Sequence, residues 1–233
     1  MSVAIGLRDW DHVVLCADRQ MTDANAGLKF EECKIVYGEN DQGQHSYKLG
    51  LTYCGDPDAA KNVFPRVREA IEAALEDEET GVGECNCHMD SDYFRGFLQS
   101  AFNSKETKRL ETLIALQATG CCFLFKTKAD QIVSGGRECI GGGDSSVLRF
   151  FADVVSRTEI PSPEKALTLG IYLVSLANRY VDGCGLGVDA LVFEDEKPFR
   201  VLSKTATEKY SERFAQFERQ IEKEFFAEPS NAI

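Results

Sequence analysis

Three residues near the start of the chain have side chains that together could cleave an amide bond. Ser2 follows the initiator methionine, Asp18 comes sixteen positions later, and Lys34 follows after another sixteen. If Met1 is removed, Ser2 carries both a hydroxyl nucleophile and a free α-amine, which titrates near roughly 8 and can act as the base. A buried pair of Lys34 and Asp18 beneath that amine would lower its pKa. The start of the sequence therefore predicts an N-terminal nucleophile.

Composition sets limits on where such a site could work. The chain has 233 residues, of which 43% are apolar and 27% charged, as in an ordinary globular protein with one sizeable core. Its net charge of −12 argues against nucleic-acid and anionic-membrane partners, which select basic surfaces. No apolar stretch approaches the length of a membrane-spanning helix, and the N-terminus lacks the pattern of a signal peptide. We therefore expect a cytoplasmic protein.

The nine cysteines have two interpretations. Their number is odd and many stand in apolar runs, where a reduced cysteine behaves as a small apolar side chain. The segment Cys85–His88, with Asp90, could instead ligate zinc, but a zinc site needs a second ligand pair at defined spacing and the sequence has no clear one. We expect reduced thiols, no metal and no cofactor.

Apolar periodicity predicts the elements that must position the three side chains. Alternation, or short apolar runs bounded by turn residues, indicates strands at 3–7, 12–17, 34–37, 45–53, 112–118, 121–126, 131–134, 188–194 and 199–202. Helical spacing, with capping residues or proline at the start, indicates helices at 57–75, 90–105, 144–155, 162–180 and about 205–227, the last of them amphipathic.

The order of these elements predicts the fold class. Strand blocks alternate with helix pairs, which is not the regular βαβ order of a parallel sheet. We expect an α+β fold in which two packed antiparallel sheets are flanked by helices, a four-layer αββα sandwich. It should form a single domain over residues 1–233.

Several segments resemble proteasome β subunits and their bacterial ring-peptidase relatives. The matching segments are 4–8, 13–22, 34–35, the strand end 53–55, the glycine turn 140–143 and the turn 182–185. The resemblance covers roughly residues 2–194, and the spacing of nucleophile, acid and lysine is its most specific part. It implies an N-terminal-nucleophile hydrolase with an αββα sandwich, a fold that is often built into rings.

The resemblance also implies roles for single residues. Ser2 falls at the nucleophile, Asp18 at the family's aspartate and Lys34 at its active-site lysine. Gly55 matches the glycine whose N–H helps to stabilise the oxyanion, and a glycine permits that close backbone approach. Thr22 matches the threonine whose backbone pairs with the substrate.

Other positions concern specificity and the orientation of the amine. By the resemblance, three residues fall near the pocket for the side chain before the cut bond: Met21, Glu32 and Tyr53. Glu32 would favour a basic residue there by charge complementarity. Three further positions would orient the amine, and all depart from the family pattern: Gly142 and Cys184 stand where serines are usual, and Asp182 lies one residue from the expected aspartate. Ser2 itself replaces the usual threonine.

The expected function is peptide-bond hydrolysis by Ser2 inside a ring-like oligomer of the chain. Peptides or unfolded proteins would be its substrates, and an ATP-dependent unfoldase a partner. Two alternatives stay open at this point: a structural subunit that kept the fold without activity, and an N-terminal-nucleophile amidohydrolase acting on small molecules, since fold alone does not fix function.

Overall fold

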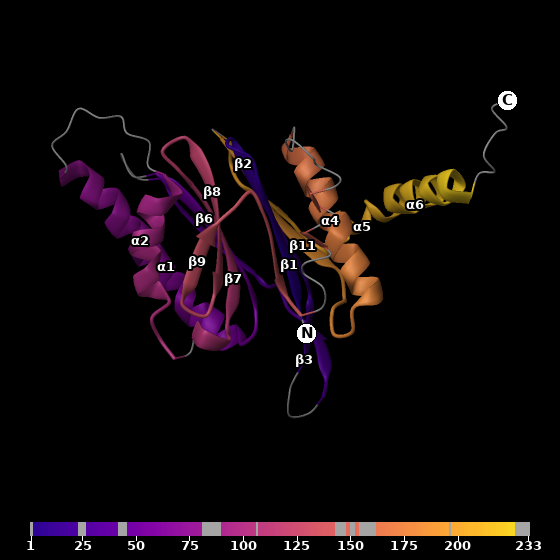
Figure 1. The fold of residues 1–233 in the computed structure, drawn as a ribbon, viewed down its shortest axis with the longest axis horizontal. Helices are drawn as coiled ribbons and strands as arrows, with labels where there is room; N and C mark the ends of the chain where they lie inside the picture. The colour runs from indigo at the N-terminus through magenta and orange to yellow at the C-terminus, as the bar shows by residue number, and fades with distance from the viewer. Residues whose placement is uncertain are drawn as a thin grey trace.

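The computed structural model contains two five-stranded antiparallel sheets that pack face to face, and a two-stranded ribbon at one end (Figure 1). The structure describes residues 2–22, 27–41, 46–80, 90–105, 107–142, 148–149, 152–153, 162–195 and 197–226.

The first sheet contains both strands of the hairpin predicted at the N-terminus. Its strands, in spatial order, are β10 (Arg137–Gly141), β1 (Val3–Arg8), β2 (His12–Asp18), β11 (Val188–Glu194) and β12 (Arg200–Leu202). All seven residues of β2 are buried, because the sheet is covered on both faces. This explains why the strand reads as an apolar run rather than as an alternating pattern.

The second sheet is a meander in chain order. Its strands are β5 (Ile35–Asn40), β6 (Tyr47–Cys54), β7 (Glu111–Ala118), β8 (Cys121–Lys128) and β9 (Gln131–Ser134). Thr119 and Gly120 join β7 to β8, and both have positive φ (53° and 75°), as a tight two-residue hairpin requires.

Small residues allow the two sheets to approach each other. A Cβ on Gly6 of β1 would come within 2.6 Å of Leu124 on β8, and a Cβ on Gly50 of β6 would overlap Leu191 on β11. The layer between the sheets is otherwise apolar, with Leu15 among its fully buried side chains. The close contact brings the ends of β2 and β5, and with them the predicted site residues, near each other.

Helices cover the outer faces of both sheets (Figure 1). Helix α4 (Pro163–Tyr180) packs on the first sheet, and α1 (Pro57–Thr80) and α2 (Ser91–Ala101) pack on the second. A short 3-10 helix, η2 (Thr107–Arg109), leads into β7. The predicted mixture of helices with antiparallel sheets is confirmed.

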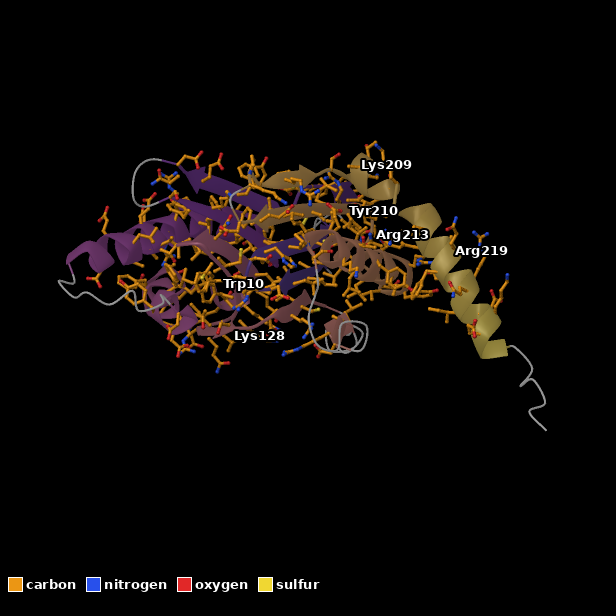
Figure 2. All side chains as sticks on the ribbon, turned by 90° about the horizontal axis from the view of Figure 1, so that it is seen from above. Trp10, Lys128, Lys209, Tyr210, Arg213 and Arg219 are labelled. Atoms are coloured by element: carbon orange, nitrogen blue, oxygen red, sulfur yellow. The ribbon has the colours of Figure 1, made fainter. Side chains whose placement is uncertain are left out.

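The C-terminal helix expected at about 205–227 is two helices in the structure. Helix α5 (Lys204–Glu208) is fixed to β11 because the Thr207 hydroxyl donates to the carbonyl of Val188 at 2.7 Å. Helix α6 (Ser211–Phe226) then runs away from the body of the molecule (Figures 1 and 2). The chain changes direction between them at residues 209–210.

Other elements also differ from the sequence prediction. Helix α2 ends at Ala101 rather than near 105. The short strands β3 (Gln20–Thr22), β4 (Lys29–Glu31) and β10 carry polar residues, so apolar periodicity does not reveal them. The expected helix at 144–155 and the Cys85–His88 segment fall largely or wholly outside the described residues. Within those residues, no helix is both long and apolar enough to cross a membrane.

Candidate active site

Asp18 and Lys34 form a fully buried ion pair. Asp18 ends β2 in the first sheet and Lys34 immediately precedes β5 in the second, so the pair joins the two sheets. The Lys34 Nζ lies 2.7 Å from Asp18 Oδ1 and 2.6 Å from the carbonyl oxygen of Gln20. Neither side chain has any exposed surface. Two charges are kept in such a place only when they are paired and hydrogen-bonded, as they are here.

Backbone N–H groups complete the surroundings of the Asp18 carboxylate. Val3 N donates to Oδ1 at 2.9 Å, and Gln20 N and Gly185 N donate to Oδ2 at 3.2 and 3.3 Å. With Lys34, the carboxylate accepts from four donors, which compensate a buried negative charge. The carboxylate thereby ties together the N-terminal strand, the strand end after β2 and the turn before β11.

Ser2 is held through its backbone on two sides. Its carbonyl accepts a hydrogen bond from Gly142 N at 3.1 Å, and the next amide, that of Val3, is the one bound to Asp18. Gly141 has φ +107°, and a Cβ on it would overlap the Ser2 carbonyl oxygen and lie 2.9 Å from Cys54 Sγ. Only glycine fits this position. The structure thus brings Ser2 to the end of the sheets where Asp18 and Lys34 meet.

Gly55, the expected oxyanion residue, follows directly after β6. Its φ is +127°, and a Cβ there would come within 2.6 Å of the Arg109 carbonyl oxygen. The position therefore needs glycine for both its conformation and its packing. The residue as a whole is exposed.

The four residues expected to contact substrate differ in exposure. Thr22 is exposed at the end of β3, whereas Met21 is buried. Glu32 is partly exposed, and its carboxylate pairs with Lys61 at 3.2 Å. Tyr53 is buried with a hydroxyl that has no hydrogen-bond partner among the described residues. Burial, followed by the negative charge of Glu32, raises the pKa of Tyr53.

The three residues expected to orient the amine are placed differently from one another. Gly142 contacts Ser2 through its N–H, as described above. Cys184 is buried, and burial, followed by the charge of Asp18, raises the pKa of its thiol to about 11. The thiol is therefore protonated at neutral pH. Asp182 is exposed in the turn after α4, with no hydrogen bond to the described part of the chain, and Gly185 from the same turn reaches Asp18 instead.

Two features of this end of the molecule were missed by sequence reasoning. One guanidinium nitrogen of Arg19 (Nη1) lies 2.6 and 2.5 Å from the two carboxylate oxygens of the buried Asp189 on β11, and the backbone N–H of Arg19 donates to the carbonyl of Gly185. Glu111 of β7 accepts a hydrogen bond from Gly141 N at 3.0 Å. The glycine-rich segment 183–187 could have pointed to the contacts of Arg19. Nothing in the sequence indicated the hydrogen bond between Glu111 and Gly141.

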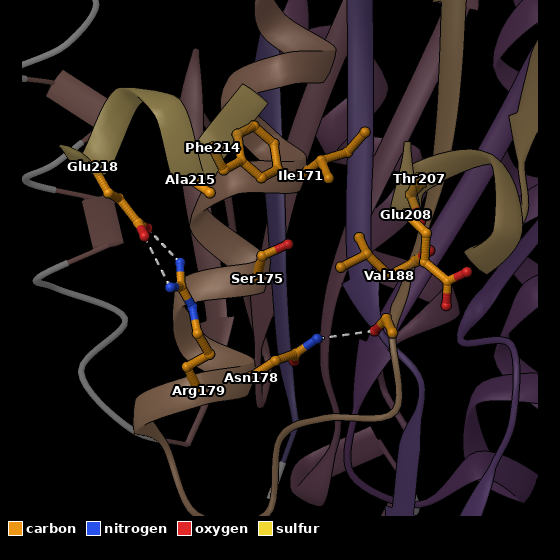
Figure 3. Close-up of a pocket in the computed structure, with 11 residues that line it drawn as sticks. Ile171, Ser175, Asn178, Arg179, Val188, Thr207, Glu208, Phe214, Ala215 and Glu218 are labelled. Atoms are coloured by element: carbon orange, nitrogen blue, oxygen red, sulfur yellow. Dashed lines mark hydrogen bonds and ion pairs between the residues drawn. The ribbon is translucent and has the colours of Figure 1, made fainter. Parts of the chain in front are cut away.

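No cluster of three or more potential metal ligands occurs among the residues that the structure describes. A cavity of about 310 Å³ lies between α4, α5 and α6, and Figure 3 shows Ser175, Asn178 and Phe214 among the residues lining it. None of the predicted site residues lines this cavity. The candidate site lies apart from this cavity and is defined by the buried pair and the N-terminus.

Comparison with solved structures places this geometry in a known fold. An Anbu variant (Gly-1 mutant) from Hyphomicrobium sp. strain MC1 superposes with a TM-score of 0.73 at 14% identity, over 100% of both chains. The chain shares the fold of Anbu. A second Anbu structure from that organism gives 0.71 at 14% identity, covering 99% of this chain and 100% of the other. Anbu from Yersinia bercovieri, described as an ancestral beta-subunit, gives 0.69 at 12% identity with the same coverage.

No protein-family model and no curated protein sequence matches the chain. The likeness to Anbu supports the proteasome-like fold that the sequence resemblance implied. At 12–14% identity it is a likeness of fold, and activity has to be argued from the site.

Proposed function

We propose that the chain is a proteasome-like N-terminal-nucleophile hydrolase that cleaves peptide bonds with Ser2. The observation that carries this proposal is the position of the Asp18 carboxylate. Its Oδ1 accepts a hydrogen bond from the backbone N–H of Val3, the residue after Ser2, and also from the buried Lys34 ammonium. An ammonium is costly to bury in a sheet sandwich, and its placement next to the N-terminus needs a reason. Control of the Ser2 amine provides that reason.

The chemistry begins once Met1 has been removed. The Ser2 Oγ attacks the carbonyl carbon of the scissile peptide while its α-amine, directly or through a water, takes the hydroxyl proton. The positive charge of Lys34 lowers the pKa of the amine and so keeps more of it as free base near neutral pH. The Gly55 N–H donates to the oxyanion that forms; such a donor is typically worth about 2.7–4 kcal/mol.

The tetrahedral intermediate then collapses. The C–N bond breaks, the leaving amine takes the proton from the Ser2 ammonium, and an ester between Ser2 and the acyl part of the substrate remains. Water attacks this ester, the α-amine again accepts the proton, and release of the acid restores the free hydroxyl. In this scheme Asp18 holds Lys34 in place and takes no proton.

Substrate recognition follows from the surroundings of the site. The backbone of Thr22 would pair with an extended peptide. Met21, Glu32 and Tyr53 would form the pocket for the side chain before the cut bond, where Glu32 favours a basic residue. Because Lys61 already pairs with Glu32, this preference should be modest.

The proposal includes the assembly. We infer a single four-layer αββα domain in the cytoplasm that joins a ring of identical subunits, receives unfolded chains from an ATP-dependent unfoldase and contacts its neighbours through α1 and α2. Closed symmetry is the usual state of homo-oligomers. Light scattering on the active protein tests this, and a fully active 25.8 kDa monomer would contradict it.

One specific observation favours a second candidate, an inactive subunit with the same fold. Gly142 has no side chain, Cys184 is a protonated thiol and Asp182 is exposed, so none of the three offers the amine a strong side-chain partner. Hydrolysis of an unstructured fluorogenic peptide decides between the two. Ser2→Thr should keep activity and Ser2→Ala, the matched variant without the hydroxyl, should lose it. Equal rates for Ser2→Ala and wild type would end the peptidase proposal.

A further inference from the structure

The Gly141–Gly142 segment at the end of β10 lies against the backbone of Ser2 and Val3. Gly141 lies opposite Val3 in the ladder between β10 and β1, and Gly142 N donates to the Ser2 oxygen. Gly142 carries no side chain, so its backbone alone reaches Ser2. Two successive glycines are also the most flexible choice for a chain segment. A contact from outside this strand pair would therefore restrain the direction of the Gly142 N–H further.

Glu111 is in the right place to do so. It is the first residue of β7 in the second sheet, and its Oε2 accepts from Gly141 N at 3.0 Å. Its other oxygen pairs with Lys128, the opposing residue on β8, at 2.8 Å. The Glu111 side chain is 25% exposed, whereas that of Lys128 is 71% exposed and projects from the surface (Figure 2).

The protonation state of Glu111 suits this contact. Burial acts to raise the pKa of the carboxyl, but hydrogen bonds from Lys128 and from the Gly141 N–H outweigh it and lower the pKa below its usual value. The group is therefore a carboxylate at neutral pH. A charged acceptor makes a stronger hydrogen bond to a backbone N–H than a neutral one does.

We propose that Glu111 is a positioning residue that fixes the Gly141–Gly142 segment across the gap between the sheets and thereby sets the position of Ser2. The inference deepens the proposed function and rests on it for its catalytic consequence. Glu111 touches neither the nucleophile nor the substrate. Its contact passes through one backbone N–H to the next, and from there to the carbonyl of the nucleophilic residue.

The catalytic consequence follows from geometry. A nucleophile reacts well only when it is held near its attack position, and a displacement of about 1 Å can cost roughly 100-fold in rate. Without Glu111, the Gly141 N–H loses its acceptor and the two glycines gain freedom. Ser2 then spends less time in the reactive position, so kcat should fall while substrate binding, which uses other residues, is retained.

Steady-state kinetics on four variants test the proposal. Glu111→Ala should lower kcat about 10- to 100-fold, with KM little changed. Glu111→Gln keeps an oxygen at the same distance and should restore most of kcat. Glu111→Asp keeps the charge but withdraws the carboxylate by one methylene, and should be impaired. Lys128→Ala, the matched control that removes only the exposed partner, should stay within about twofold of wild type.

Two kinetic outcomes would overturn the positioning role. One is a Glu111→Ala variant with wild-type kcat; the other is a Glu111→Gln variant as impaired as Glu111→Asp. If Glu111→Ala does not fold, the Gln and Asp variants still test the proposal. Glu111→Gln conserves the length of the side chain and should keep most of kcat, whereas Glu111→Asp conserves only its charge and should lower kcat.

Amide hydrogen exchange provides a readout that does not need activity. The Gly142 amide should exchange faster in Glu111→Asp than in wild type, and more slowly in Glu111→Gln than in Glu111→Asp. Unchanged exchange in Glu111→Asp would refute the proposal whatever the kinetics. If wild type cleaves no peptide but the exchange rates change as expected, the positioning contact stands and the proposed function fails.

Discussion

Breaking the Asp18–Lys34 pair from either side should destabilise the protein strongly. Lys34→Met removes the cation and leaves a fully buried carboxylate with only its three backbone donors. Asp18→Asn removes the charge, but all four groups facing Asp18 are donors, so the NH₂ of asparagine must point at two of them. Removing one partner of a buried pair typically costs about 3–5 kcal/mol, and we expect each single variant to lie in this range.

The double variant makes the prediction sharper. With both charges gone, no unpaired ion is left inside, so the loss should be smaller than the sum of the two single losses by about 1–3 kcal/mol. Arg68→Ala serves as a control, since it breaks an exposed pair with Glu72 and should change stability by less than about 0.5 kcal/mol. Urea unfolding of wild type and the four variants, at one fixed protein concentration, gives the free energies of unfolding.

Single losses below about 1 kcal/mol, or strictly additive losses, would mean that the two charges are solvated or apart. Activity is measured on the same samples, with circular dichroism to confirm folding. A folded Lys34→Met variant that hydrolyses peptide at the wild-type rate would show that Lys34 has no role in catalysis.

Three further outcomes are expected. Gly141→Ala should lose most activity and some stability because its methyl group would overlap the Ser2 carbonyl, whereas Gly120→Ala, with φ +75° but open space around it, should remain active; equal effects in kinetics and thermal melts would contradict this. Burial raises the pKa of Cys184 from 9.0 to about 11, so the contribution of the protonated thiol to stability is complete below pH 9 and is lost as the pH rises from 9 to 11. In Cys184→Ala, the free energy of unfolding measured in urea should therefore fall less steeply over this pH range than in wild type. An unchanged slope would disprove this. Glu32→Gln should reduce the preference for a basic residue before the cut bond, and a peptide library with an unaltered preference would dismiss that role.

Much of this architecture could be predicted because it is encoded in local patterns. The apolar run before Asp18 places this acid at the end of a buried strand, and the strand at 35–40 follows Lys34 directly. Glycine and proline signals give the start of α1 at Pro57 and the turn after Tyr180. The mixed fold with antiparallel sheets follows from the order of such segments.

The rest of the fold and of the site depends on contacts that cannot be predicted from residue types. Strand β10 has too little apolar alternation to be recognised, and it is formed because β1 offers it a partner. Gly185 reaches Asp18 through a backbone N–H, a group that nearly every residue has. The role of Glu111 depends on two sheets meeting at one point. Such contacts become visible only when the chain is folded.

Intact-mass spectrometry of the active protein tests most directly whether Ser2 acts with a free α-amine, as we propose. The mass should correspond to a chain that begins at Ser2, and brief acid quenching during turnover of a peptide ester should add one acyl group to the N-terminal fragment. Any residue before Ser2 would convert the base into an amide. Fully active protein that retains Met1 would contradict the mechanism.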